Sequence, residues 1–189
     1  MRRAKVFSKI DLGSGYQQVR IKDEYVHKTS FRARYGSYEF VVVPFGFTNA
    51  PAMFMCFKNN VFSSYFDKCV LVFLDDTLTY SRDEEKLVEQ LRLILKLFKK
   101  HTLYAKLSRC DLYEHRIHYL GHIILDKGIY VDPERIVAIM RTPAPRKMTF
   151  VRSFLGFVVY CRKLFEGYST GKVEPMYRLM SPTCVLVVT

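Results

Sequence analysis

Two short apolar segments of this 189-residue sequence both end in aspartate, and this feature constrains the fold more than any other. Residues 8–10 predict a short strand that ends at Asp11, and residues 70–74 predict a second strand that is followed by Asp75 and Asp76. Central strands that end side by side in one sheet would bring these residues together, although they lie far apart in the sequence. We therefore expect three carboxylates at one edge of a sheet.

The chemistry of such a cluster indicates hard divalent cations. None of the residues directly next to the three aspartates is a Lys or Arg, and three like charges without a cation raise the pKa of at least one carboxyl group. Two Mg²⁺ ions about 3.5–4 Å apart can clamp the attacking and leaving oxygens of a phosphoryl transfer. Aspartate also favours turns, so the pair Asp75 and Asp76 taken alone is more typical of a solvated turn.

Hydrophobic periodicity and turn signals predict strands mixed with helices, which is typical of an α+β fold. Besides the two strands above, the sequence predicts strands at 29–35, 38–43, 78–80, 117–125 and 129–131, joined by turns at 36–37, 75–77 and 126–128. A first helix is expected after a cap at Thr48 or Asn49. A stronger helix is expected after a capping box formed by Ser81 and Glu84. Two shorter helices follow, capped by Asp132 and Thr149.

The charge of the chain favours a polyanionic partner. Lys and Arg number 30 against 18 Asp and Glu, which gives a net charge of +12, and residues 141–178 alone carry +6. A basic excess of this size indicates nucleic acid before a membrane surface. The sequence has no apolar run long enough for a signal peptide or a membrane span, so we expect an intracellular protein, cytoplasmic or nuclear, with reduced cysteines.

A series of short motifs follows in a fixed order along residues 6–168. The motifs are FSKIDL at 7–12, SGY at 14–16, KTSFR at 28–32, YEF at 38–40, PFGFTNAP at 44–51, VFLDD at 72–76, LYAKL at 103–107, YLGH at 119–122, VDP at 131–133 and RSFLG at 152–156. Together they resemble the reverse transcriptase of gypsy-type LTR retrotransposons. The resemblance implies a right-hand polymerase: an α+β palm with an antiparallel sheet and packed helices, partial fingers, and the helical start of a thumb.

The resemblance also implies roles for individual residues. The catalytic carboxylates would be Asp11, Asp75 and Asp76, which with Leu12 would bind two Mg²⁺ ions, or Mn²⁺ in their place. Residues that would contact the incoming deoxynucleoside triphosphate are Leu12, Gly13, Ser14, Gly15, Tyr16, Phe45, Gly46 and Lys106. Residues that would contact an RNA or DNA template-primer are Phe73, Leu74, Leu120, Gly121 and His122. Tyr16 would be the steric gate against ribonucleotides.

Two of these residues have simpler interpretations of their own. Tyr16 is equally a core tyrosine at the start of a strand, because a phenol ring buries a large apolar area. Lys106 taken alone is typical of a solvated surface lysine, because lysine is seldom buried. The motifs that contain them are what favours the functional interpretation.

The sequence departs from the family at both ends. Only ten residues precede Asp11, where family members have a fingers segment, and the resemblance fades after Gly167. We expect a palm with residual fingers at 1–131, the start of a thumb at 132–168 and a divergent tail at 169–189, all as a fragment of a retroelement. Two functions stay open: an RNA-directed DNA polymerase core, or a catalytically inactive remnant that at most binds nucleic acid through its basic surface.

Overall fold

The computed structural model describes residues 1, 4–143 and 147–159, which form two compact units. The first unit comprises residues 1–119 and 125–127, and the second comprises residues 120–124 and the described residues from 128 onward. The predicted tail at 169–189, the end of the predicted thumb and most of the basic segment at 141–178 lie outside the described residues. No helix in the described ranges is both long and apolar enough to cross a membrane.

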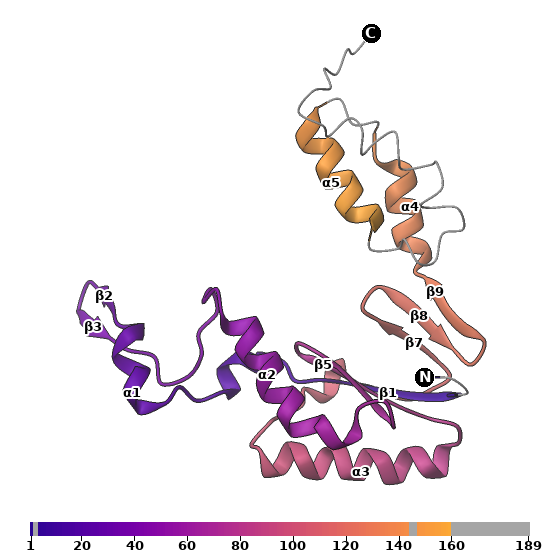
Figure 1. Ribbon diagram of the computed structural model, residues 1–189, viewed down its shortest axis with the longest axis horizontal. Helices are drawn as coiled ribbons and strands as arrows, with labels where there is room; N and C mark the ends of the chain where they lie inside the picture. Colours follow the sequence, from indigo (N-terminus) through magenta and orange to yellow (C-terminus); the bar gives the residue numbers. More distant parts are fainter. Residues whose placement is uncertain (2–3, 144–146, 160–189) are drawn as a thin grey trace. The chain divides into compact units, whose positions relative to one another are not determined.

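A four-stranded sheet in the order β4-β5-β1-β6 forms the centre of the first unit (Figure 1). Its strands are β1 (Val6–Asp11), β4 (Val70–Phe73), β5 (Asp76–Ser81) and β6 (Asp111–Glu114). The central strand β1 pairs antiparallel with β5 from Val6 opposite Ser81 to Asp11 opposite Asp76. The two predicted apolar strands are confirmed, whereas β6 was not predicted, because its polar sequence DLYE lacks a strand pattern.

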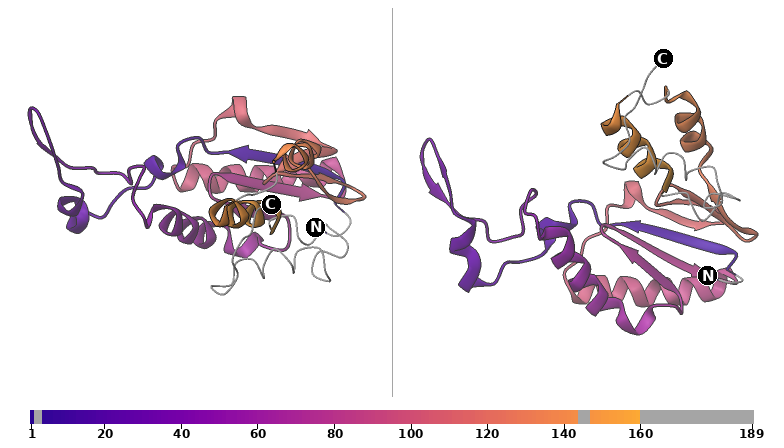
Figure 2. Two further views of the ribbon diagram at one scale, coloured as in Figure 1. Left: turned by 90° about the horizontal axis from the view of Figure 1, so that it is seen from above. Right: turned by 45° about the horizontal axis from the view of Figure 1, so that its top comes forward.

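The helices α2 (Ala50–Phe62) and α3 (Glu84–Lys100) contribute to one hydrophobic core with the sheet, and Figure 2 shows α3 running along the strands. The buried members of this core are Ile10, Leu12, Phe54, Phe62, Val70, Leu91, Ile94, Phe98 and Leu103. Burying one such large apolar side chain stabilises the fold by about 1.5–3 kcal/mol. Ile10 and Leu12, the residues on either side of Asp11, belong to this core, so the core fixes the end of β1 that carries Asp11.

The predicted capping box at the start of α3 is wrong. Ser81 is the last residue of β5, and Asp83 is the N-cap, whose Oδ1 accepts a hydrogen bond from the backbone N–H of Lys86 at 2.9 Å. Both residues are favourable N-caps, and the longer pairing of β5 with β1 makes Ser81 part of the sheet. At α2, Asn49 occupies the N-cap as predicted, but its side chain makes no capping hydrogen bond.

The hairpin near the N-terminus is shorter than predicted. Its strands are β2 (Phe31–Ala33) and β3 (Gly36–Tyr38), and Ala33 pairs with Gly36, so the turn lies at residues 34–35 and not at 36–37. All six strand residues are exposed, so no buried face fixes the register of the hairpin. The turn therefore lies two residues before its predicted position. Short helical segments near this hairpin and elsewhere are α1 (Asp23–Val26), η1 (Gly15–Gln18), η2 (His27–Thr29), η3 (Ser63–Tyr65) and η4 (Leu107–Arg109).

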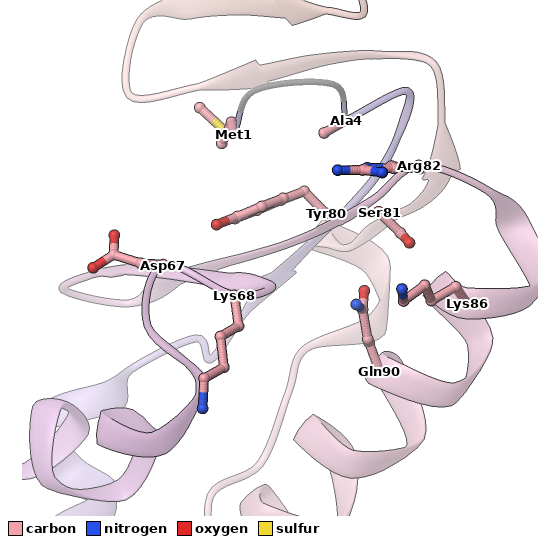
Figure 3. Close-up of a pocket in the computed structure, with 9 residues that line it drawn as sticks. All are labelled: Met1, Ala4, Asp67, Lys68, Tyr80, Ser81, Arg82, Lys86 and Gln90. Atoms are coloured by element: carbon pink, nitrogen blue, oxygen red, sulfur yellow. The ribbon is translucent and has the colours of Figure 1, made fainter.

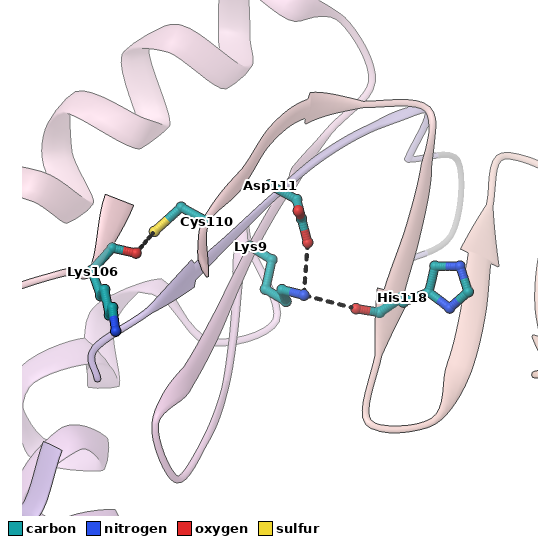
Figure 4. Close-up of polar contacts among 5 residues, drawn as sticks. All are labelled: Lys9, Lys106, Cys110, Asp111 and His118. Atoms are coloured by element: carbon teal, nitrogen blue, oxygen red, sulfur yellow. Dashed lines mark hydrogen bonds and ion pairs between the residues drawn. The ribbon is translucent and has the colours of Figure 1, made fainter. Parts of the chain in front are cut away.

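Lys9 connects three strands of the first unit (Figure 4). Its ammonium group lies 2.7 Å from the Asp111 carboxylate of β6 and donates a 3.4 Å hydrogen bond to the carbonyl of His118 in β7 (Arg116–Tyr119). In the same region, the Cys110 thiol donates to the carbonyl of Lys106 at 3.3 Å. The two contacts of Lys9 attach the segment after α3 to the central strand β1.

A second sheet has three strands in the order β7-β8-β9, with β8 (His122–Leu125) and β9 (Gly128–Val131). The single strand predicted at 117–125 is therefore wrong, because Leu120 and Gly121 form a turn with positive φ angles of 50° and 69°. The predicted turn at 126–128 is confirmed at residues 126–127.

The second unit contains α4 (Pro133–Arg141) and α5 (Met148–Val159). The predicted cap of α4 is confirmed, since the Asp132 carboxylate accepts a 3.0 Å hydrogen bond from the N–H of Glu134. The predicted cap of α5 at Thr149 is wrong, because the helix already begins at Met148.

The packing of α3 predicts a matched pair of stability effects. Ile94 is fully buried in the core, whereas its neighbour Leu95 is 45% exposed. Ile94→Ala should lower the free energy of unfolding by about 2–5 kcal/mol, because it leaves a cavity. Leu95→Ala on the same helix should change it by only about 0.5 kcal/mol. Urea unfolding monitored by circular dichroism measures both, and equal effects would contradict the packing of α3.

Candidate catalytic site

The structure brings the three predicted aspartates to one edge of the central sheet. Asp11 ends β1 and is the direct cross-strand partner of Asp76, the first residue of β5. Asp75 lies in the turn before β5, and its carbonyl accepts a 3.2 Å hydrogen bond from the N–H of Leu12. The expected turn at 75–77 is thus corrected to residues 74–75, because Asp76 and the buried Thr77 already pair with β1 and β4.

Burial and mutual repulsion both act on these carboxylates. The pKa of Asp75 is raised mainly by burial and further by the charge of Asp11, while Lys58 opposes the shift. The pKa of Asp76 is likewise raised by burial first and by Asp11 and Asp75, against the charges of Lys9 and Lys58. A raised pKa means that the ionised form lacks full compensation by its surroundings.

The Asp75 carboxylate is only partly satisfied by the protein. Its Oδ1 is buried and accepts no hydrogen bond of good distance and angle in the described part of the chain, although the nearby backbone N–H of Gly15 favours the ionised carboxylate and opposes the rise of its pKa that burial causes. An orphaned buried carboxylate oxygen is costly unless a cation or water binds it.

Lys58 is a charged residue of the site that the sequence analysis did not find. It lies on α2 with no exposed surface, and its ammonium group donates hydrogen bonds to the carbonyls of Leu74 at 2.5 Å and Asp76 at 3.3 Å. Burial lowers the pKa of Lys58 to about 8, although the three aspartates oppose this shift. Its spacing of four residues from Phe54 and from Phe62 places it on the buried face of α2, and that periodicity was the signal available in the sequence.

The loop after β1 is tightly held by backbone and side-chain hydrogen bonds. The N–H of Gly13, which has a left-handed φ of 47°, donates to the Asp11 carboxylate at 2.6 Å. Gln18, which was not predicted to matter, donates through Nε2 to the carbonyls of Leu12 at 2.7 Å and Gly13 at 3.0 Å. Gln18 also accepts from the N–H of Tyr104 at 2.7 Å, so the loop has a defined shape.

Tyr16 and its neighbours form the wall beside the carboxylates. The Tyr16 ring makes edge-to-face contacts with Phe45 and Phe54, with ring centroids 5.5 and 5.3 Å apart. The pKa of the Tyr16 hydroxyl is raised by burial first and then by the nearby charge of Asp75. Phe45 is 58% exposed and precedes Gly46, so both are open to a ligand.

The structure brings some of the other predicted residues to the site and leaves others apart. The backbone N–H of Lys106 donates to the carbonyl of Asp11 at 2.9 Å, and its side chain is exposed beside Gly13. Phe73 and Leu74 directly precede Asp75, and Phe73 is exposed. The remaining predicted residues belong to the second unit: Leu120, Gly121 and His122. There, burial and the charge of Arg135 lower the pKa of His122.

The donor set fits a hard cation in kind. Carboxylate oxygens are the preferred ligands of Mg²⁺, and Asp75 Oδ1 has no other partner within the described residues. However, no group of three His, Cys, Asp or Glu in those residues is arranged to hold a metal ion as the side chains stand. The Asp11 carboxylate instead accepts the hydrogen bond from the Gly13 N–H.

A separate cavity lies at the opposite end of β5 (Figure 3). It is lined by Met1, Ala4, Asp67, Lys68, Tyr80, Ser81, Arg82, Lys86 and Gln90. Neither the aspartates nor the wall around Tyr16 contributes to it. The aspartates therefore lie outside this cavity.

The sequence of this chain is similar to those of known proteins. The sequence profile of a family described as reverse transcriptase (RNA-dependent DNA polymerase) matches residues 1–124. The chain is 33% identical over 166 residues to the Retrovirus-related Pol polyprotein from transposon opus of Drosophila melanogaster. The aligned residues cover 88% of this chain and 17% of that relative. It is 30% identical over 175 residues to the Transposon Tf2-3 polyprotein of Schizosaccharomyces pombe, covering 93% of this chain and 13% of the relative. The chain thus spans less than a fifth of each of these relatives.

Solved structures show the same fold. The foamy viral protease-reverse transcriptase in complex with an RNA/DNA hybrid matches 94% of this chain and 24% of its own, with a TM-score of 0.80 and 22% identity. The foamy viral protease-reverse transcriptase dRH in complex with double-stranded DNA matches 94% of this chain and 31% of its own, with a TM-score of 0.84 and 22% identity. The predicted α+β fold, a polymerase palm with helices packed on an antiparallel sheet, is confirmed.

The close approach at Gly15 predicts a test of the site geometry. A Cβ atom at Gly15 would collide with Asp75 Oδ1 and would lie 2.6 Å from the Phe54 ring, whereas one at the helical Gly156 would meet nothing. Gly15→Ala should therefore lower the free energy of unfolding by about 1–3 kcal/mol. Gly156→Ala should be neutral or stabilise by up to about 1 kcal/mol. Thermal unfolding of both variants measures this, and a neutral Gly15→Ala would show that Gly15 is not packed against Asp75.

Proposed function

The chain belongs to the reverse transcriptase (RNA-dependent DNA polymerase) family, and on this basis we propose that it is the catalytic core of an RNA-directed DNA polymerase from a gypsy-type LTR retroelement. The observation that carries the proposal is the pairing of Asp11 with Asp76, with Asp75 in the adjoining turn. The similarity to transposon polyproteins supports a retroelement origin.

The aspartates would hold the metal ions of nucleotidyl transfer. Two Mg²⁺ ions, or Mn²⁺ in their place, would be bound by Asp11, Asp75 and Asp76 together with Leu12. When bound, these ions supply positive charge that stabilises the attacking 3′-oxygen of the primer and the departing pyrophosphate. The orphaned Oδ1 of Asp75 and the raised pKa of both Asp75 and Asp76 support this role, because each indicates carboxylates that lack a full complement of cations.

The incoming deoxynucleoside triphosphate would lie against the loop after β1. The loop residues Leu12, Gly13, Ser14 and Gly15 would face its phosphates, and the exposed Lys106 would add a positive charge beside Gly13. The sugar would lie against the Tyr16 ring, with Phe45 and Gly46 below it. This arrangement is supported by the edge-to-face contact between Tyr16 and Phe45.

The template-primer would be held by two sets of residues. Phe73 and Leu74 would contact the primer end, and Leu120, Gly121 and His122 would grip its backbone. We propose a palm with residual fingers at 1–131 and the start of a thumb at 132–168. The net charge of +12 supports binding to nucleic acid through phosphate contacts.

Primer extension tests the catalytic role directly. With Mg²⁺, deoxynucleotides and a primed RNA template, Asp75→Asn should lower the extension rate at least about a hundredfold, because it removes a charge from the metal site. Asp126→Asn, the same change at an exposed hairpin turn, should leave the rate unaltered. If the folded parent protein extends no primer, yet binds nucleic acid in a salt-sensitive manner that Asp75→Asn does not change, the inactive remnant is the correct interpretation.

The position of Tyr16 predicts a change in sugar selection. Tyr16→Ala should lower the preference for deoxynucleotides over ribonucleotides by about tenfold or more, because it opens the space beside the 2′-carbon. The control is Tyr35→Ala, whose ring is 83% exposed. The ratio of kcat/KM for the two nucleotides is the measurement. An unchanged ratio would leave Tyr16 as a core residue only.

A further inference from the structure

We propose that Lys58 is a resident counter-ion of the Asp11, Asp75 and Asp76 carboxylates and competes with divalent cations for this cluster. The inference rests on the proposed function in one respect, because it takes the carboxylates to be the metal site. It adds a residue that limits how tightly the site binds its metal.

The position of Lys58 is fixed by its contacts. Its side chain has no exposed surface, and its ammonium group donates to the carbonyls of Leu74 and Asp76, the residues on either side of Asp75. The same ammonium lies 5.5 Å from the centroid of the Phe54 ring on α2. A buried ammonium group is retained only where such partners compensate for the loss of water. The charge is therefore held directly beneath the turn that carries Asp75.

The hydrogen bonds of Lys58 do not occupy the carboxylate oxygens. Both of its acceptors are backbone carbonyls, and the buried Asp75 Oδ1 has no hydrogen-bond partner in the part of the chain that the structure describes. Lys58 therefore acts on the aspartates through its charge. A divalent cation that binds their oxygens must do so beside a fixed positive charge.

Lys58 is held against more of the cluster than Lys9 is. Its ammonium group donates to the carbonyls on either side of Asp75, and Asp76 pairs directly with Asp11. By contrast, the ammonium group of Lys9 is paired with Asp111. Because like charges repel strongly where water is excluded, Lys58 is the side chain whose removal should most improve cation binding.

The sign of the effect separates this role from a structural one. If Lys58 only positioned the turn through Leu74 and Asp76, its loss would displace Asp75 and weaken metal binding. If Lys58 is a competing charge, its loss strengthens metal binding. The two roles thus predict opposite changes in affinity.

Titration with Mn²⁺ alone, followed by calorimetry, is the test. Lys58→Met should bind Mn²⁺ about tenfold more tightly than the parent, because one repelling charge is gone. Lys96→Met makes the same change on the exposed face of α3 and should bind like the parent. Lys58→Gln provides a second neutral variant, with a polar side chain in place of an apolar one. Circular dichroism establishes that each variant tested is folded.

A thermal readout checks the same point without any nucleic acid. Saturating Mn²⁺ should raise the melting temperature of Lys58→Met more than that of the parent, because tighter binding stabilises the folded state more. When Asp75 is also replaced by Asn, Lys58→Met should increase the Mn²⁺-induced rise in melting temperature by less, because one of the carboxylates near Lys58 is then neutral.

The outcomes distinguish the inference from the function on which it rests. Equal or weaker Mn²⁺ affinity of folded Lys58→Met and Lys58→Gln, with a parent that binds Mn²⁺ and extends primers, overturns only the counter-ion role. If neither the parent nor any variant binds Mn²⁺, the metal role of the aspartates falls and the inference falls with it. Tighter binding by both Lys58 variants supports the counter-ion role even if the parent extends no primer.

Discussion

The antiparallel pairing of β1 with β5 is the constraint on which the rest of the site depends. Its register places Asp11 opposite Asp76 and Ile10 opposite the buried Thr77. A shift of one residue would turn every side chain of β1 to the other face of the sheet. The core residues Ile10 and Leu12 prevent that shift, because both are almost fully buried. The apolar packing of the palm therefore sets the position of its charged edge.

The charged edge in turn depends on cations that come from other elements. Asp75 and Asp76 are partly withdrawn from water, and Lys9 from β1 and Lys58 from α2 offset their charge. Lys9 is shared with Asp111 and ties the edge to β6. Lys58 lies wholly inside the protein. The protein interior that fixes the positions of the aspartates thus also contains Lys58, which balances part of their charge. A bound metal ion therefore has less negative charge to neutralise than it would beside three aspartates alone.

Sequence patterns predicted the parts of this arrangement that depend on local structure. The strands leading to Asp11 and Asp75 and the amphipathic helix α3 follow from short runs of apolar residues. Where two local structures are about equally favourable, the sequence did not predict which one forms. Strand pairing determines both cases: the N-cap of α3 is Asp83, and the hairpin turn lies at residues 34–35. Lys58 was missed for another reason. A lysine within the apolar face of a helix normally indicates that this face is not fully buried. The hydrogen-bond acceptors of Lys58 are the backbone carbonyls of Leu74 and Asp76, which no sequence pattern reveals.

If the strand ends that carry the aspartates bind divalent cations, anomalous scattering from crystals grown with Mn²⁺ should locate the ions there. An anomalous difference peak is expected within ligand distance of the carboxylates of Asp11 and Asp75, with the Asp11 side chain released from Gly13. Ordered aspartates with no anomalous peak between them at saturating Mn²⁺, or Mn²⁺ bound only elsewhere on the chain, would show that these aspartates do not form a cation site.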